Sequence, residues 1–284
     1  MSQAPTDVEK VAVVTGAASG FGAALARRFT EAGMRVVVLD RDEHGAETEA
    51  AALRGLGQEA VGWAADVTDG DSLARSAAAT REAYGRCDVL CANAGVLQVG
   101  ALDRLTDDDW RWALDVNLLG VVRTVRAFLP LLRETPGDRH VVITASVSGL
   151  VTNPRLGAYA ASKAAVMSYG ETLRLELAPE RIGVTLLLPA AMATGIVENS
   201  AAARPSDLSG WLALDEDWQV MAETDPHESE LLSADAATEH LLAQILADEP
   251  YAITHGKTRL AWAERTTALA AAFERMERAR GTRP

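Results

Sequence analysis

The stretch that decides the fold runs from Val11–Thr15 through Gly16-Ala17-Ala18-Ser19-Gly20-Phe21-Gly22. Its first five residues, VAVVT, are a continuous apolar run typical of a buried strand, and a helical pattern follows the glycines. Glycine has no Cβ, so the backbone can turn tightly and approach a pyrophosphate, to which the helix N-terminus presents oriented N–H groups. Glycines also occur in ordinary turns, but this position between a strand and a helix predicts a dinucleotide-binding loop. The residues expected to contact the cofactor here are Gly16, Ser19, Gly20, Phe21 and Gly22.

Apolar strands and amphipathic helices alternate along the rest of the chain. The expected strands are Val11–Thr15, Arg35–Asp40, Glu59–Ala64, Cys87–Ala92, His140–Ala145 and Ile182–Leu188, with a seventh around Tyr251–Thr254. The expected helices are Gly20–Ala32, His44–Leu56, Ser72–Tyr84, Asp107–Leu132 and Leu156–Ala178. Thr106, followed by three aspartates, is expected to cap the fourth helix. Fully apolar strands separated by helices predict a doubly wound parallel sheet of about seven strands, covered by helices on both faces, in a single α/β domain over residues 1–284.

The composition is that of an ordinary globular protein with an acidic balance. The chain has 284 residues, of which 48% are hydrophobic and 24% charged, and its formal net charge is −13. This length is sufficient for one large domain with a buried core. A nucleic-acid-binding face needs a basic stripe, and an anionic membrane surface needs a run of Lys and Arg, and the sequence has neither pattern. We therefore expect neither nucleic acid nor a membrane as a partner.

The N-terminus and the cysteines indicate a cytoplasmic protein. The first ten residues, MSQAPTDVEK, lack the charged-then-apolar order of a signal peptide. The most apolar stretch, Val184–Ala193, is too short to span a bilayer and contains a proline. Cys87 and Cys91, four residues apart in a strand, would lie about 13 Å apart, too far for a disulfide, and are expected to be reduced core residues. The five histidines are scattered without the spacing of metal ligands, so no metal is predicted.

Three segments depart from the alternation of strands and helices. Residues 1–9 are expected to be a disordered leader. Residues 190–230 contain Pro205, a string of acidic residues, and Trp211 and Trp218. A long irregular insertion in a compact domain is either a lid over a site or a disordered loop, and the tryptophans favour a substrate lid. Within residues 257–284, Ala261–Arg280 is predicted as a charged amphipathic helix that packs on the body.

The end of the second strand bears on the choice of cofactor. Arg35–Asp40 ends in a carboxylate 18 residues after Gly22. An acidic side chain there accepts hydrogen bonds from the ribose hydroxyls and repels a 2′-phosphate. The adjacent Arg41 could instead accommodate that phosphate, and Asp40 could merely open a turn with Asp42. Because the carboxylate holds the discriminating position, NAD(H) is favoured, and NADP(H) is not excluded.

Three further blocks follow the glycine loop in a definite order. They are Asn93-Ala94-Gly95 after the fourth strand, Ser146 after the fifth, and Tyr159-Ala160-Ala161-Ser162-Lys163 in the fifth helix. Together with the glycine spacing G-x3-G-x-G, they resemble the single-domain branch of the short-chain dehydrogenase/reductase family, from about Val8 to Thr194. The resemblance implies a Rossmann fold and an NAD(P)-dependent oxidoreductase that interconverts a secondary alcohol and a ketone.

The same resemblance implies further site residues. Asp66 and Val67 would contact the adenine, and Asn117 would be the active-site asparagine that positions a water between Lys163 and bulk solvent. The remaining cofactor residues would be Asn93, Ala94, Gly95, Pro189, Met192 and Thr194, with Thr194 on the nicotinamide carboxamide. Two positions depart from the family pattern: Ala190 stands where a glycine usually follows the proline, and Ala92 replaces the asparagine often found before the Asn-Ala-Gly block. Neither departure removes a reacting group.

The Tyr159–Lys163 pair fits proton transfer that accompanies hydride transfer. A tyrosine is a poor base at neutral pH, with an ordinary pKa of about 10, and a nearby ammonium lowers that value. The two residues are four apart in a predicted helix, so their side chains share a face. Ser146 follows a strand at its carboxyl end, where its hydroxyl could hold the substrate oxygen. Each residue also has an ordinary structural role, but the set of Ser146, Tyr159, Lys163 and Asn117 in family order predicts catalysis, with Tyr159 and Lys163 also touching the cofactor.

The substrate is less constrained by the sequence. The expected pocket residues are the neighbours of the catalytic set: Val96, Leu97, Ser146, Val147, Ser148, Asn153, Leu156, Tyr159, Ala190, Met192 and the lid residue Trp211. Most are apolar, which favours a hydrophobic small molecule, aromatic or alicyclic. Two other functions stay open: an epimerase or dehydratase, as in longer relatives, and a dinucleotide sensor without catalysis. By resemblance the chain forms a homotetramer or homodimer through the helices at Asp107–Leu132 and Leu156–Ala178.

Overall fold

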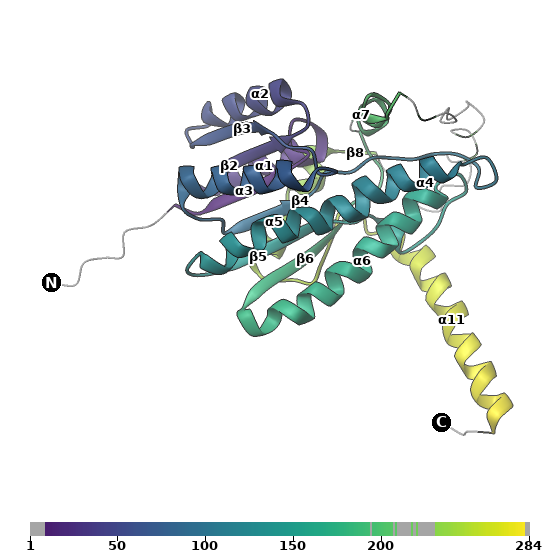
Figure 1. The fold of residues 1–284 in the computed structure, drawn as a ribbon. Helices are drawn as coiled ribbons and strands as arrows, with labels where there is room; N and C mark the ends of the chain where they lie inside the picture. Colours follow the sequence, from purple (N-terminus) through teal and green to yellow (C-terminus); the bar gives the residue numbers. More distant parts are fainter. Residues whose placement is uncertain are drawn as a thin grey trace.

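A computed structural model describes residues 9–193, 195–206, 208, 217, 220 and 231–281. Its centre is a parallel sheet in the order β3-β2-β1-β4-β5-β6-β9 (Figure 1). The strands are β1 (Val11–Thr15), β2 (Arg35–Asp40), β3 (Ala60–Ala64), β4 (Val89–Ala92), β5 (Arg139–Thr144), β6 (Ile182–Leu188) and β9 (Tyr251–Ile253). The predicted seven-stranded parallel sheet is therefore confirmed. The chain winds outward from β1 to β3 and then crosses back to β4, so the strand order reverses between β1 and β4, where doubly wound sheets bind ligands.

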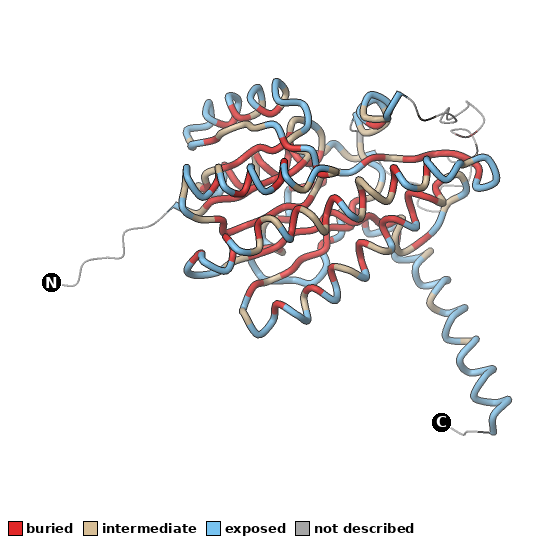
Figure 2. The backbone as a smooth tube through the Cα atoms, viewed as in Figure 1, coloured by how far each residue is buried: buried red, intermediate tan, exposed pale blue. Residues whose placement is uncertain are grey.

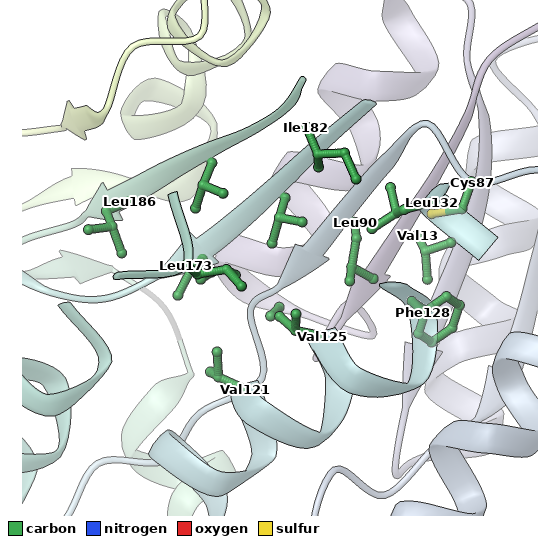
Figure 3. Close-up of a cluster of buried hydrophobic side chains, with 14 of the residues drawn as sticks. Val13, Cys87, Leu90, Val121, Val125, Phe128, Leu132, Leu173, Ile182 and Leu186 are labelled. Carbon is green, nitrogen blue, oxygen red and sulfur yellow. The ribbon is translucent and has the colours of Figure 1, made fainter. Parts of the chain in front are cut away.

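Helices cover both faces of the sheet because successive strand residues point to opposite sides. The helices are α1 (Gly20–Glu31), α2 (Glu43–Arg54), α3 (Gly70–Tyr84), α4 (Asp107–Leu114), α5 (Gly120–Glu134), α6 (Gly157–Leu177), α7 (Ile196–Ala203), α9 (Ala234–Thr238), α10 (Leu241–Leu246) and α11 (Thr258–Arg280). Val13 of β1 belongs to a buried cluster with Phe128 of α5 and Leu173 of α6 (Figure 3). Its neighbour Val14 belongs to the cluster on the other face, with α1, α2 and α10. The two clusters make the sheet a rigid platform with only its strand ends open.

The helix predicted over Asp107–Leu132 is present and runs without a break from Asp107 to Glu134, but its geometry changes in the middle. A π-helical turn, Asp115–Leu119, separates α4 from α5. Its wider turn accommodates one extra residue and buries Asn117 completely; such turns often occur at functional sites. The predicted cap is confirmed: Thr106 Oγ1 accepts a hydrogen bond from Asp109 N at 3.3 Å, and Asp109 Oδ2 accepts one from Thr106 N at 2.7 Å.

Helix α11 projects away from the body into solvent (Figures 1 and 2), which corrects the expectation that it packs on the body. Thr258 is its only buried residue, and Phe273 is 65% exposed. Near its start, Arg265 donates a hydrogen bond to the carbonyl of Leu150. Alanines and charged residues alternate along the helix and leave no wide apolar face, so its sequence pattern did not specify what it contacts.

A separate two-stranded sheet closes the base of the predicted lid. β7 (Met192–Ala193) and β8 (Leu232–Ser233) pair in parallel and bring residues 192 and 232 together. Thr194, Trp211, Trp218, most of the remaining lid and the first eight residues of the predicted leader lie outside the described residues. Cys87 and Cys91 are buried and free, as predicted. Within the described part of the chain, no helix is long and apolar enough to cross a membrane, and no cluster of three metal-binding side chains occurs.

Candidate active site

The predicted site residues gather at the carboxyl ends of neighbouring strands. Gly16 follows β1, Asp40 ends β2, Asn93 follows β4, Ser146 follows β5 and Pro189 follows β6. Parallel strands end at one edge of the sheet, so the topology brings together residues up to 173 positions apart between Gly16 and Pro189. Ligands of doubly wound sheets bind outside this edge.

The glycine loop makes close backbone contacts that side chains would prevent. Gly16 and Gly20 have φ angles of +65° and +57°, in the left-handed region that favours glycine. A Cβ on Gly22 would lie 2.1 Å from the carbonyl oxygen of Gly16. Phe21 turns away from the loop into the core, where it is 8% exposed, so its contribution to a cofactor site is through the backbone.

The start of α1 is suited to an anion. Side chains of Asp42, Asp69 and Thr106 cap the starts of α2, α3 and α4. By contrast, Ser19, which precedes α1, makes no capping hydrogen bond to this helix. The first N–H groups of α1 therefore have no side-chain acceptor, and a phosphate would satisfy them. The loop and helix thus fit a dinucleotide pyrophosphate.

Asp40 is the last residue of β2 and Arg41 follows it, and the two side chains contact different groups. Asp40 Oδ2 accepts a hydrogen bond from Ala18 N at 3.1 Å, and its Oδ1 accepts one from Asp42 N at the same distance. The carboxylate thus ties the glycine loop to β2 and opens the turn with Asp42. Its predicted contact with the ribose stays a prediction. Arg41 Nη1 donates to the carbonyl oxygen of Ala203, the last residue of α7, at 2.9 Å.

Asn93 uses its side chain to hold three strand ends together. Its Nδ2 donates to the carbonyl oxygens of Thr15 at 3.0 Å and Gly16 at 3.2 Å, and its Oδ1 accepts from Thr144 Oγ1 at 2.9 Å. The following Ala94 packs so closely that a Cβ on Gly16 would lie 2.7 Å from its Cα. Asn93 therefore shapes the cofactor edge through internal hydrogen bonds, and Gly95 beside it is exposed.

Asp66 and Val67, which follow β3, divide between surface and core. Asp66 is exposed, and its Oδ1 accepts hydrogen bonds from Thr68 N at 2.8 Å and Thr68 Oγ1 at 2.7 Å. Val67 is 8% exposed and lies against Gly120 at the start of α5, where an added Cβ would approach Val67 Cγ2 to 2.8 Å. The pair thus lies at the β3 end of the same sheet edge, as the predicted adenine contact requires.

Tyr159 and Lys163 lie in the first two turns of α6 and are both buried. The Lys163 Nζ lies 5.8 Å from the centre of the Tyr159 ring and donates a hydrogen bond to the carbonyl oxygen of Thr144 at 2.9 Å. Burial lowers the pKa of Lys163 to about 8. Burial also raises the pKa of Tyr159, while a side-chain hydrogen bond with Ser146 acts in the opposite direction. The structure therefore brings Ser146, Tyr159 and Lys163 into one cluster.

Asn117 is held by the π-helical turn against the loop after β4. Its Oδ1 accepts from Val96 N at 2.8 Å, and its Nδ2 donates to Val96 O at 2.9 Å and to Ser162 Oγ at 3.0 Å. A Cβ on Gly95 would lie 3.1 Å from Asn117 Oδ1 and 3.3 Å from Lys163 Nζ. Asn117 and Lys163 thus approach one another across a glycine, while both N–H groups and one oxygen lone pair of the Asn117 side chain are engaged in hydrogen bonds.

The predicted substrate residues differ in how far they are exposed. Val96, Val147 and Leu156 are buried, whereas Leu97, Ser148, Asn153, Ala190 and Met192 are partly exposed. Asn153 Oδ1 is buried and has no hydrogen-bond partner among the described residues. Ser146 Oγ accepts from Ser148 N at 3.1 Å and lies 3.4 Å from the carbonyl oxygen of Pro189. Trp211 and Thr194 lie outside the described residues, so their predicted contacts stay predictions.

Sequence reasoning missed several residues that organise the site. Thr144 holds Lys163 through its carbonyl and Asn93 through its hydroxyl. Its position two residues before Ser146 at a strand end was the available signal. Helix α7 was also missed: Asn199 Nδ2 donates to Ser19 Oγ at 2.9 Å, and Ser200 Oγ accepts from Leu97 N at 2.8 Å. No motif marks these two residues.

The doubly wound sheet and its glycine loop define the class of dinucleotide-binding α/β proteins. Within that class, the short chain dehydrogenase family matches residues 10–205. The chain therefore belongs to the short chain dehydrogenase family, a family of oxidoreductases that use a nicotinamide dinucleotide.

Named relatives and a solved structure agree with this assignment. A C alpha-dehydrogenase of Sphingobium sp. is 35% identical over 193 residues, which cover 68% of this chain and 63% of that protein. A 1-deoxy-11-beta-hydroxypentalenate dehydrogenase of Streptomyces exfoliatus is 38% identical over 197 residues, 69% of this chain and 72% of that protein. A short chain dehydrogenase/reductase of Burkholderia phymatum, solved in complex with NAD, superimposes with a TM-score of 0.84 at 34% identity, covering 93% of this chain and 95% of that one.

Proposed function

We propose that this oxidoreductase interconverts a secondary alcohol and a ketone on a hydrophobic, aromatic or alicyclic small molecule, with NAD(H) as its cofactor. The observation that carries the proposal is the buried cluster of Ser146, Tyr159 and Lys163 at the carboxyl edge of the sheet, beside the glycine loop. Titratable groups with shifted pKa values that gather at a ligand-binding edge are candidates for catalysis.

The chemistry divides among the residues of this cluster. The nicotinamide, when bound, supplies the hydride acceptor or donor. In the oxidation direction, Tyr159 would take the proton of the substrate hydroxyl, and Ser146 would hold the substrate oxygen and stabilise its developing charge. The ammonium of Lys163 would favour the phenolate form of Tyr159. Asn117 would keep the loop after β4 and the start of α6 in register through Val96 and Ser162.

Two contacts support NAD(H) over NADP(H). Asp40 presents a carboxylate at the end of β2, where it would repel a 2′-phosphate. Arg41, which could neutralise that phosphate, is instead hydrogen-bonded to the carbonyl oxygen of Ala203. The Burkholderia relative, solved with NAD, is consistent with this preference.

The surroundings of the cluster support an apolar substrate. Val96, Val147 and Leu156 are apolar, and Asn153 Oδ1 is a buried acceptor without a partner among the described residues, which a substrate hydroxyl could satisfy. Residues 190–230 would form a lid over this substrate, and β7 and α7 lie within this segment. The name of the Streptomyces relative, a hydroxypentalenate dehydrogenase, describes dehydrogenation of a hydroxyl-bearing compound, which agrees with this substrate class.

A panel of cyclic and aryl secondary alcohols with NAD⁺ or NADP⁺, followed at 340 nm, tests the proposal. Tyr159→Phe should lower kcat by roughly 10²–10⁴-fold while NADH binding is retained. Tyr169→Phe, on the same helix and partly buried, is the matched control and should keep full activity. Full activity of Tyr159→Phe would contradict the mechanism, and tight NADH binding without turnover of any substrate would favour the sensor.

We also propose that the chain forms a homodimer or homotetramer through α4, α5 and α6. Leu119, in the π-helical turn between α4 and α5, and Leu175 of α6 are 42% and 77% exposed, which leaves apolar surface that a second copy would cover. Light scattering coupled to size-exclusion chromatography measures the mass directly, and Leu175→Glu should shift an oligomer towards monomer.

A further inference from the structure

Helix α7 contacts three segments at the carboxyl edge of the sheet through its own side chains and backbone. Asn199 donates to Ser19 of the glycine loop at 2.9 Å. Ser200, which is 1% exposed, accepts from the backbone of Leu97 at 2.8 Å. The C-terminal carbonyl of the helix, on Ala203, accepts from Arg41 at 2.9 Å. The position of α7 therefore places a carbonyl acceptor beside Arg41.

The residue that fixes the end of α7 is Arg204, which directly follows it. Its guanidinium contacts the carboxylate of Asp109 on α4, and its Nη1 donates to Gln98 Oε1 at 2.9 Å. It also lies over the ring of Trp112, with Cζ 5.5 Å from the ring centre. The Arg204 side chain is 7% exposed and that of Asp109 is 0% exposed. An ion pair this deeply buried is strongly destabilising to break, so it anchors α7 firmly.

Hydrogen bonds at the start of α4 keep the Asp109 carboxylate charged and oriented towards Arg204. Burial acts to raise the pKa of Asp109, but the hydrogen bond from Arg204 and two from Thr106 hold that pKa below its ordinary value. One carboxylate oxygen serves Thr106 N and Oγ1, at 2.7 and 2.8 Å, and the other faces Arg204. The carboxylate is therefore ionised and fully engaged, and Arg204 compensates its charge.

The ion pair of Arg204 and Asp109 bears on Arg41 because it holds the helix whose last carbonyl Arg41 contacts. Arg41 is exposed, it follows Asp40 at the ribose end of β2, and a guanidinium there is the natural partner of a 2′-phosphate. In this structure its Nη1 is bound to the last carbonyl of α7, at the negative end of the helix dipole. While Arg204 holds α7 in place, Arg41 is directed towards the helix end.

We propose that Arg204 is a specificity-determining positioning residue for the cofactor. Through Asp109 it seats α7, and the Ala203 carbonyl then keeps Arg41 from pairing with the 2′-phosphate of NADP(H). The same seating keeps Asn199 on Ser19 of the glycine loop. This inference rests on the proposed function, because it assumes that the dinucleotide binds at the carboxyl edge with its adenosine ribose near Asp40.

The test compares the dissociation constants of NADH and NADPH, measured by cofactor fluorescence, and needs no substrate. Arg204→Met should weaken NADH binding and strengthen NADPH binding, moving their ratio about tenfold towards NADPH. Because that variant leaves Asp109 buried without its cation, Asp109→Asn/Arg204→Met is made in parallel, and it should show the same change in the ratio with a smaller loss of melting temperature. Arg111→Met, which removes an exposed ion pair on α4, is the matched control and should leave the ratio unchanged.

A second substitution tests the route through Arg41. Adding Arg41→Ala to Arg204→Met should abolish the gain in NADPH affinity, since no guanidinium would remain to meet the phosphate. An unchanged ratio in both Arg204 variants would overturn the proposal, and so would a gain in NADPH affinity that survives Arg41→Ala. If the unaltered protein bound neither cofactor, the proposed function itself would fail, and the two failures are thereby distinguished.

Discussion

The parallel strands of the central sheet all begin at one edge, called here the amino edge, and all end at the opposite one, the carboxyl edge. Both edges bury charged and polar side chains, but the roles of these side chains differ. At the amino edge, Asp88 is 1% exposed and accepts two hydrogen bonds from Arg86, at 2.8 and 2.6 Å, and one from Val11 N at 2.8 Å. His140 Nε2 is hydrogen-bonded to Thr185 Oγ1, at 2.8 Å, and Thr185 donates to Glu249 O at 2.6 Å. These bonds close within the protein, so the polar groups of this set satisfy one another.

At the carboxyl edge some polar groups have no hydrogen-bond partner among the described residues. The first N–H groups of α1 have no side-chain cap, and Asn153 Oδ1 has no partner within the described part of the chain. A hollow alone does not identify a site: a cavity of about 540 Å³ lies at the amino edge, lined by Asp88, His140 and Arg174 among others. The glycine loop and the uncapped start of α1 distinguish the carboxyl edge from the amino edge better than the presence of a cavity does.

The largest effect should come from the amino edge and should affect stability alone. Asp88→Ala leaves the guanidinium of Arg86 and the N–H of Val11 without their acceptor, which should cost about 3–5 kcal/mol of unfolding free energy in urea titrations. Asp108→Ala, which removes an exposed i,i+3 pair with Arg111, is the control and should cost at most about 0.5 kcal/mol. NADH affinity of the folded Asp88→Ala protein should be unchanged; a large loss of affinity would mean that the two edges are not independent.

The second-largest effect is expected for a substitution at the carboxyl edge, and it should lower NADH affinity. A Cβ on Gly22 would meet the Gly16 carbonyl at 2.1 Å and Asn93 Nδ2 at 2.6 Å, so Gly22→Ala must open the loop. NADH affinity should fall more than about 100-fold, or roughly 3 kcal/mol, measured by fluorescence titration. Gly256→Ala is the control, since an added Cβ there meets no atom within 4 Å. Retained NADH affinity in Gly22→Ala would remove the glycine loop from the proposed site.

The sequence was sufficient to predict the parts of the site that depend on backbone geometry. A glycine loop between β1 and α1 requires particular residue types at particular spacings, and the helical spacing of Tyr159 and Lys163 determines which way they face. The seven strands followed in the same way, because strands buried on both faces must be apolar throughout. These features are local, so their pattern is visible in one sequence.

The parts that the sequence did not predict depend on single pairs of distant residues. Arg204 and Asp109 are 95 positions apart, and neither has a periodic neighbour that marks it. Likewise, the π-helical turn at Asn117 interrupts a helix whose apolar pattern continues on both sides, and α11 extends from the body although its composition resembles that of a packed helix. Such features are decided by tertiary contacts that local propensity does not encode.

A pH experiment sharpens the comparison at the amino edge. Burial lowers the pKa of His140 from 6.5 to about 4. Between these values the unfolded chain binds a proton that the folded protein excludes, so stability is lost as the pH falls from about 6.5 to about 4. The contribution between pH 7 and pH 4.5 should be about 2 kcal/mol. His140→Gln should show a correspondingly shallower loss of unfolding free energy in urea titrations at the two pH values; an equal slope in both proteins would contradict a neutral, buried imidazole.

The smallest effect should come from α11, which belongs to neither edge. Ending the chain after Arg265 keeps the hydrogen bond to Leu150 and removes residues 266–284, of which the described residues 266–281 are exposed or only partly covered. Because exposed residues contribute little to the folded state, the unfolding free energy should change by less than about 0.5 kcal/mol, and NADH affinity should not change. The shortened chain is also informative if this expectation fails. A difference in melting temperature between the full and the shortened chain that grows with protein concentration would mean that a second copy covers α11, since only an intermolecular contact makes stability depend on concentration.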